Sequence, residues 1–158
     1  MATHTVGPND YIRPYRGPVR TRAFKEEASQ SFRYGAVVVQ DASTKDEVEE
    51  AGSDPTARIL GVAAEAAGGV ADVKRLVYLA EPGVEFVARV QDTGTLAAAN
   101  VGTEYGLVKD GTNNIWRVDL SETSNTNVIV TELIDPIGDV NGRVAFQFKA
   151  AARGINPG

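Results

Sequence analysis

The chain of 158 residues contains no cysteine and a single histidine, His4. The absence of cysteine excludes disulfide scaffolds, thiolate nucleophiles, iron–sulfur clusters and cysteine-ligated zinc. A Ser-His-Asp triad or a histidine-rich metal site would have to use His4, whose place close to the start of the sequence is a poor one for an oriented imidazole. We therefore expect no catalytic residues, no cofactor and no bound metal, and we expect that the protein is not an enzyme.

Long hydrophobic runs are also missing. No stretch approaches the roughly 20 apolar residues that cross a bilayer as a helix. The first ten residues, MATHTVGPND, lack the basic region followed by an apolar region that marks a secretory signal. We expect a soluble protein that is made in a cytoplasm and has no membrane partner.

Positive charge is concentrated at the start of this otherwise acidic chain, whose net charge is −5. Five of the 16 basic residues lie within the first 25 positions, beside a single acidic residue, Asp10. The five are Arg13, Arg16, Arg20, Arg22 and Lys25. This asymmetry indicates a basic segment that binds something negative and an acidic body that does not bind nucleic acid.

Residues 1–30 are rich in proline and glycine, with Pro8, Pro14 and Pro18 spaced so that no helix and no central strand is expected. We predict an extended N-terminal arm, without which residues 31–158 would still fold. Its large apolar side chains need a surface to lie on, and arginine and tyrosine are enriched at interfaces. The predicted contact residues of the arm are Tyr11, Ile12, Arg13, Tyr15, Arg16, Val19, Arg20, Arg22 and Phe24.

Three interpretations of the arm stay open: docking on another protein, phosphate contacts with nucleic acid, and a disordered tail without a role. Docking on a protein is favoured, because five charges interrupted by prolines make a modest footprint for nucleic acid. Binding should weaken only partly with salt, since the apolar contacts of Tyr11, Ile12 and Tyr15 would persist.

Residues 31–158 show short β-rich runs separated by turn signals such as Glu81-Pro82-Gly83 and Asn141-Gly142. The runs are residues 32–39, 59–64, 74–80, 85–91, 105–108, 115–120, 127–133 and 143–149. Eight short strands at this spacing predict an all-β fold, a small barrel or a sandwich. Short helices are expected at residues 43–51 and 95–101.

Two groups of side chains in the body have both a structural and a functional interpretation. The acidic run Asp46, Glu47, Glu49 and Glu50 lacks the ligand alternation of a calcium loop, which favours a solvated face. The aromatic residues Trp116, Tyr105, Tyr78 and Phe86 could form a sugar-binding platform, but they lie within strand patterns, which favours the core or a subunit contact.

Several segments, read in order, resemble the head decoration, or cement, proteins of tailed bacteriophages. The segments are FRYGAVVV, ILGVAAEAAGG, KRLVYLAEPGVEFVARV, EYGLVKDGTNNIWRVDLSET and DPIGDVNGRVAFQF, and they cover roughly residues 32–149. The resemblance implies a small β-barrel or β-tulip-like decoration domain over residues 31–158. It further implies a homotrimer on the outer capsid surface of a virion, which binds the major capsid protein and clamps neighbouring coat subunits. The family often binds through an N-terminal arm, here residues 5–30.

The leading hypothesis is therefore a structural capsid decoration protein made in the host cytoplasm. One alternative is a carbohydrate- or cell-surface-binding β-module that uses Tyr105 and Trp116. Another is a tail or neck component of a virion, which would share most of these features.

Overall fold

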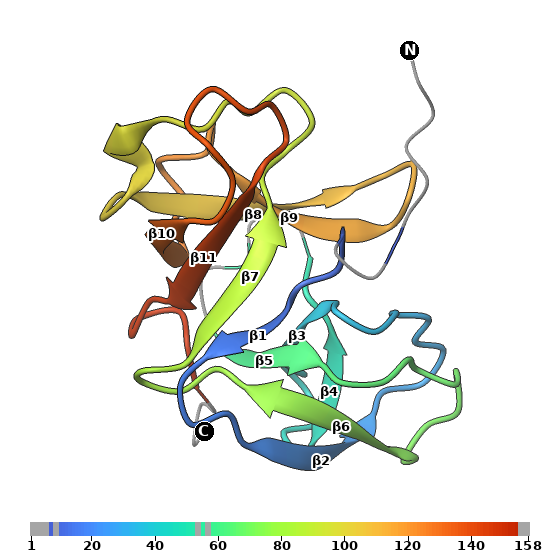
Figure 1. The fold of residues 1–158 in the computed structure, drawn as a ribbon. Helices are drawn as coiled ribbons and strands as arrows, with labels where there is room; N and C mark the ends of the chain where they lie inside the picture. Colours follow the sequence, from blue (N-terminus) through green and yellow to red (C-terminus); the bar gives the residue numbers. More distant parts are fainter. Residues whose placement is uncertain (1–6, 8–9, 53–54, 56–57, 155–158) are drawn as a thin grey trace.

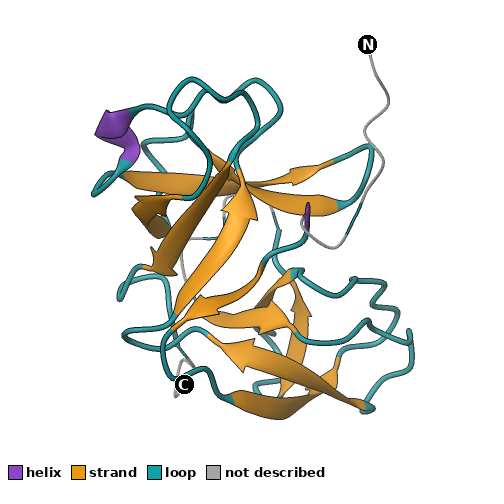
Figure 2. Ribbon diagram, in the orientation of Figure 1, coloured by secondary structure: helices purple, strands orange, loops and turns teal. Residues whose placement is uncertain are grey.

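The protein has an all-β fold, as the sequence predicts (Figure 2). The computed structural model describes residues 7, 10–52, 55 and 58–154, so that His4 lies outside the described residues. The strands are β1 (Arg13–Arg16), β2 (Thr21–Glu26), β3 (Val37–Gln40), β4 (Glu47–Glu50), β5 (Ile59–Ala63), β6 (Lys74–Leu79), β7 (Glu85–Arg89), β8 (Glu104–Asp110), β9 (Ile115–Asp119), β10 (Val128–Leu133) and β11 (Arg143–Phe148). A 3-10 turn, η2 (Ala98–Asn100), precedes β8. Among the described residues, no helix has the length and apolar character of a membrane span.

Five strands close into a barrel in the order β2-β4-β3-β5-β6, in the lower half of Figure 1. Its neighbouring strands are antiparallel except for β2 and β4, which run parallel. The strands β3 and β5 are buried along their whole length, because their sequences VVVQ and ILGVA are almost entirely apolar. The closure removes free strand edges from this half of the molecule.

The other six strands form an antiparallel sheet in the order β1-β7-β11-β10-β8-β9. The sheet curls, since an isolated bridge between Val90 and Val118 brings the end of β7 to β9. Its centre holds the rings of Phe86, Phe146 and Phe148, with centroids 5.4–6.1 Å apart. The buried apolar residues of the barrel and of this sheet form one continuous core.

All eight strand runs predicted for residues 31–158 are present, and both predicted helices differ from expectation. Residues 43–51 were expected to be helical, but they contain the strand β4, in which Val48 is fully buried between half-buried glutamates. Pairing with β2 on one side and β3 on the other holds the segment extended and is incompatible with a helix. At residues 95–101 the helical part is the single turn η2.

Residues 13–16 and 21–26 are strands of the β-fold, and the prediction of an arm without strands is wrong. Strand β1 pairs with β7 at the edge of the six-stranded sheet, and β2 lies between β4 and β6 in the barrel. Pro14 is accommodated because an edge strand does not need every N–H group. Gly17 and Pro18 occupy the turn between the strands, and the proline-free sequence TRAFKE then forms β2.

Two buried carboxylates fix this N-terminal segment. The carboxylate of Asp10, 3% exposed, accepts a hydrogen bond of 2.6 Å from Nε of Arg89 on β7. Glu26, fully buried at the end of β2, accepts from Nε of Arg75 at 2.6 Å and from the backbone N–H groups of Gly68 and Val70. These contacts bind the segment to the sheet and to the loop that leads into β6.

Candidate functional site

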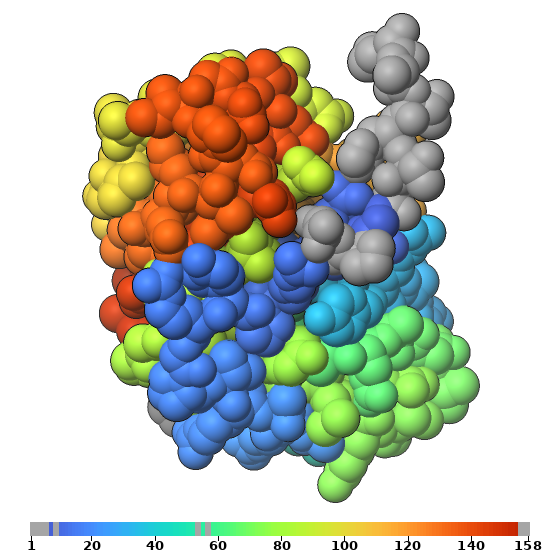
Figure 3. Space-filling model, in the orientation of Figure 1, coloured from blue at the N-terminus to red at the C-terminus, as the bar shows by residue number. Residues whose placement is uncertain are grey.

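The structure divides the nine predicted contact residues between the surface and the core. Ile12 is 0% and Phe24 7% exposed, so these two side chains belong to the core and not to a surface that a partner contacts. Tyr11, Arg13 and Val19 are half-buried. Tyr15, Arg16, Arg20 and Arg22 are exposed, and we refer to these four side chains as the exposed strip. Figure 3 shows the N-terminal segment in blue, crossing one face between the orange-red part of the sheet and the green part of the barrel.

The first two side chains of the exposed strip, Tyr15 and Arg16, are held by acidic residues of the six-stranded sheet. The Tyr15 hydroxyl donates to Oε2 of Glu132 at 3.2 Å, and Arg16 pairs with the same carboxylate. Nε of Arg16 lies 3.0 Å from Oε2 of Glu85 on the neighbouring strand β7. The guanidinium carbon of Arg16 also lies 4.9 Å from the centroid of the Tyr15 ring. Tyr15 and Arg16 therefore form one ordered polar and aromatic group.

The turn between β1 and β2 sets the direction of the exposed strip. Gly17 has φ +101°, in the region that favours glycine. A Cβ atom at this position would overlap the carbonyl oxygen of Gly83, in the turn between β6 and β7. The close approach of the two turns requires glycine and places the strip across the junction of the two sheets.

At the lower end, Arg20 and Arg22 lie on the barrel. Arg20 forms a two-point contact with Glu81, with Nε 2.9 Å from Oε2. The hydrogen bond from Arg20 lowers the pKa of Glu81 and keeps that carboxylate charged. The guanidinium carbon of Arg22 lies 4.9 Å from the centroid of the Phe24 ring, and Arg22 has no carboxylate partner among the described residues. Arg22 thus presents an uncompensated, ordered positive charge.

The sequence identified the arginines and tyrosine of this surface but not the residues around them. The glutamates that pair with the strip lie about 60 to 120 residues further along the chain than their arginines, and the strand pairing brings them together. They are Glu81, Glu85 and Glu132. The lysines Lys45 and Lys74 beside Arg22 were also missed. Lys74 is placed by the register of β2 against β6 and Lys45 by the loop before β4, and a sequence gives neither.

The aromatic platform suggested as an alternative is in the core. Phe86 is 0%, Trp116 2% and Tyr105 6% exposed, and Tyr78 is half-buried against Tyr34. Trp116 does line an open hollow of about 710 Å³ between the barrel and the β8–β9 hairpin, beside Glu122. With its ring covered, Trp116 has no free face on which a sugar could stack.

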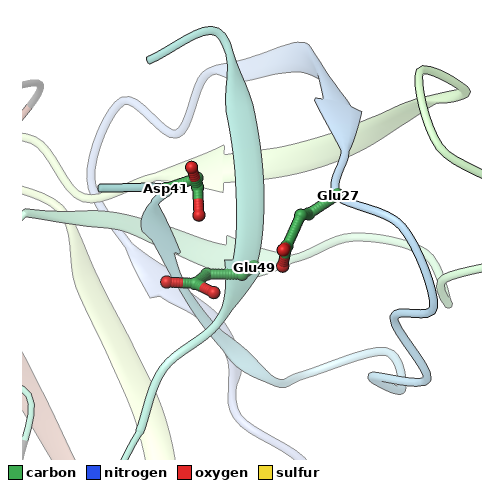
Figure 4. A group of neighbouring side chains, drawn as sticks. All are labelled: Glu27, Asp41 and Glu49. Carbon is green, nitrogen blue, oxygen red and sulfur yellow. The ribbon is translucent and has the colours of Figure 1, made fainter. Parts of the chain in front are cut away.

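Three carboxylates from different parts of the barrel meet at Glu27, Asp41 and Glu49, where one oxygen of each lies within 4.8 Å of the others (Figure 4). Burial raises the pKa of Glu49, and the charges of Asp41 and Glu27 raise it further. Asp41 has a lowered pKa, chiefly because it accepts the backbone N–H of Thr44, and it also accepts that of Ser43 at 2.8 Å. Three such oxygens are fewer than the six to eight that calcium takes, so the group is best described as a carboxylate cluster in which ionisation of Glu49 is disfavoured.

No family model matches this chain, and no curated protein matches its sequence.

Proposed function

We propose that this chain is a structural capsid decoration protein, which attaches to the outer surface of a phage head and clamps neighbouring subunits of the major capsid protein. The proposal rests on the resemblance of residues 32–149 to such proteins. The structural observation that supports it is the exposed strip, in which one tyrosine and three arginines lie on a backbone held by β1 and β2. Tyrosine and arginine are the residues that most often concentrate binding energy at interfaces.

The chemistry of the exposed strip fits a protein partner. Arginine binds carboxylates in a planar, two-point geometry, and Arg22 has no carboxylate partner among the described residues, so a partner's carboxylate can pair with it. Tyr15 adds aromatic area that is 42% exposed. We expect the acidic remainder of the surface to face solvent. We also propose that three copies assemble on the particle, as the family resemblance implies.

The test is the occupancy of purified particles by a variant in which all four side chains of the exposed strip are replaced by alanine. Occupancy should fall sharply, and the particles should lose heat resistance. The control is Arg33→Ala, which removes an exposed arginine outside the strip and should leave occupancy unchanged. Full occupancy by the four-alanine variant contradicts the proposal. The trimer is contradicted if the protein sediments as a monomer and also binds particles as single copies.

Salt gives a second measurement of the same attachment. The sequence favours only a partial loss with salt, on the basis of apolar contacts from Tyr11, Ile12 and Tyr15. Since Ile12 is buried and Tyr11 packs edge-on against Tyr34, attachment should depend on charge more strongly than that, and be mostly lost by about 0.5 M salt. Labelling that locates the protein on heads or on tails separates decoration from the tail or neck alternative.

A further inference from the structure

The barrel carries a basic groove around Arg22 that is distinct in composition from the rest of this acidic chain. Two hollows of about 380 and 350 Å³ share Arg22 and Phe24 in their lining. The first is also lined by Arg20 and Glu81, and the second by Lys25, Lys45, Lys74 and Asp46. We call the two hollows together the Arg22 groove.

Charge within the Arg22 groove is only partly compensated. Its five cations face two carboxylates that line it, in a chain whose net charge is −5. Glu81 pairs with Arg20, and Asp46 lies 3.0 Å from Nζ of Lys25, which also approaches Asp72. In the part of the chain that the structure describes, Arg22, Lys45 and Lys74 pair with no carboxylate. These three cations line the second hollow together, so an anion bound there would face positive charge from several elements.

The groove also has an apolar floor at one end. Phe24, Leu60, Leu79 and Ala80 line the first hollow, directly beside the guanidinium of Arg22. Stacking over Phe24 holds that guanidinium in place, so that its planar N–H donors are preorganised. The combination suits a ligand that alternates carboxylates with apolar side chains.

We infer that the Arg22 groove binds an acidic, partly apolar segment of a partner protein. A carboxylate of the segment would pair with Arg22, further carboxylates would lie near Lys45 and Lys74, and an apolar side chain would fill the first hollow. Nucleic acid fits the groove less well, because proteins that bind it present a basic domain and this chain has a sequence pI of about 4.9. The inference rests on the proposed function for the identity of the partner, since Arg22 also belongs to the exposed strip.

The test is fluorescence anisotropy of the purified full chain with three labelled probes. They are a short peptide of alternating glutamate and leucine, the same peptide with glutamine in place of glutamate, and an oligothymidylate of equal charge. The glutamate peptide should bind, and Arg22→Glu should weaken its binding by at least about tenfold through loss of charge-assisted contacts. Lys74→Glu, at an exposed strand position, should weaken it in the same direction.

The matched control is Arg33→Glu, which makes the same charge change at an exposed residue outside the groove, and should change affinity by less than about twofold. Unchanged circular dichroism shows that each variant is folded. Equal binding of the glutamine peptide, equal loss in the control, or tighter binding of the oligothymidylate overturns the inference. If the protein binds particles but does not bind the glutamate peptide, the inference about the groove is wrong and the decoration proposal stands. If the protein binds the peptide but does not bind particles, the decoration proposal is wrong and the inference about the groove stands.

Discussion

Replacing Ile12 by alanine tests whether the N-terminal segment belongs to the fold. Ile12 is 0% exposed, and its side chain packs in the continuous core just before β1. The substitution removes three carbons, which at about 0.8 kcal/mol for each buried methylene amounts to about 2.4 kcal/mol. The cavity that remains adds to this, so we expect a loss of about 2–5 kcal/mol in the free energy of unfolding. Small domains have only about 5–15 kcal/mol in total.

The assay is urea denaturation followed by circular dichroism, in which the midpoint should fall while the slope stays constant. Ile137→Ala is the matched control, because it makes the same chemical change at a side chain that is 65% exposed, and it should shift the free energy by no more than about 0.5 kcal/mol. If Ile12→Ala is as stable as the control, the segment is a tail. Deletion of residues 1–25 should unfold the protein, contrary to the prediction from sequence, because it removes β1 and most of β2.

Three further substitutions test other local arguments. Glu49→Gln should stabilise the protein at pH 7 and lose this effect in acid. Burial and two neighbouring carboxylates raise the pKa of Glu49, so ionisation of this side chain costs stability as pH rises through that pKa. Denaturation at several pH values measures the effect, and equal effects at all pH values contradict it. Burial alone would raise the pKa of Glu26, but hydrogen bonds led by that from Arg75 lower it, so the carboxylate contributes stability that is lost as pH falls through its folded pKa. Glu26→Gln should therefore reduce the melting temperature at pH 7 more than near pH 4, and the reverse order would refute the role of the charge. Gly17→Ala should reduce the melting temperature because its Cβ would overlap Gly83, whereas Gly111→Ala, with open space around that position, should have little effect.

The strands that the sequence predicts correctly are those in which apolar residues alternate or run together between clear turn signals. RVAFQFK and EFVARVQ form β11 and β7, although three consecutive residues of each strand are buried, so that both faces are covered and not one face as the alternation predicts. Strand β4 was missed because EVEE is mostly acidic and only Val48 marks its buried face. The sequence does not predict β1 and β2, because three prolines in one short segment argue against strands there. Proline excludes only the positions where an N–H is needed, and Pro14 occupies an edge strand.

The candidate surface was predictable in its composition but not in its geometry. The density of arginine and tyrosine identified the segment, and four of its nine predicted contact residues are exposed. Which four are exposed does not follow from a simple alternation, because Tyr15 and Arg16 are consecutive in β1 and the first three residues of β2 are all exposed. Two lysines of the Arg22 groove, Lys74 and Lys45, reach it from β6 and from the loop before β4. Contacts between residues so distant in sequence depend on the closure of the barrel.

Because β1 and β2 hold the backbone of the exposed strip, binding a partner costs less conformational entropy than it would for a disordered arm. A disordered arm would lose about 1–2 kcal/mol of backbone entropy for each residue that a partner orders. Strands β1 and β2 have already fixed this backbone, so a partner needs to order only side chains, at about 0.5–1.5 kcal/mol each. The same strands withdraw Ile12 and Phe24 into the core, which leaves less apolar area for a partner. Attachment through this surface should thus depend on a few well-placed guanidinium–carboxylate contacts around Tyr15 and Arg22, with specificity set by their fixed spacing rather than by buried area.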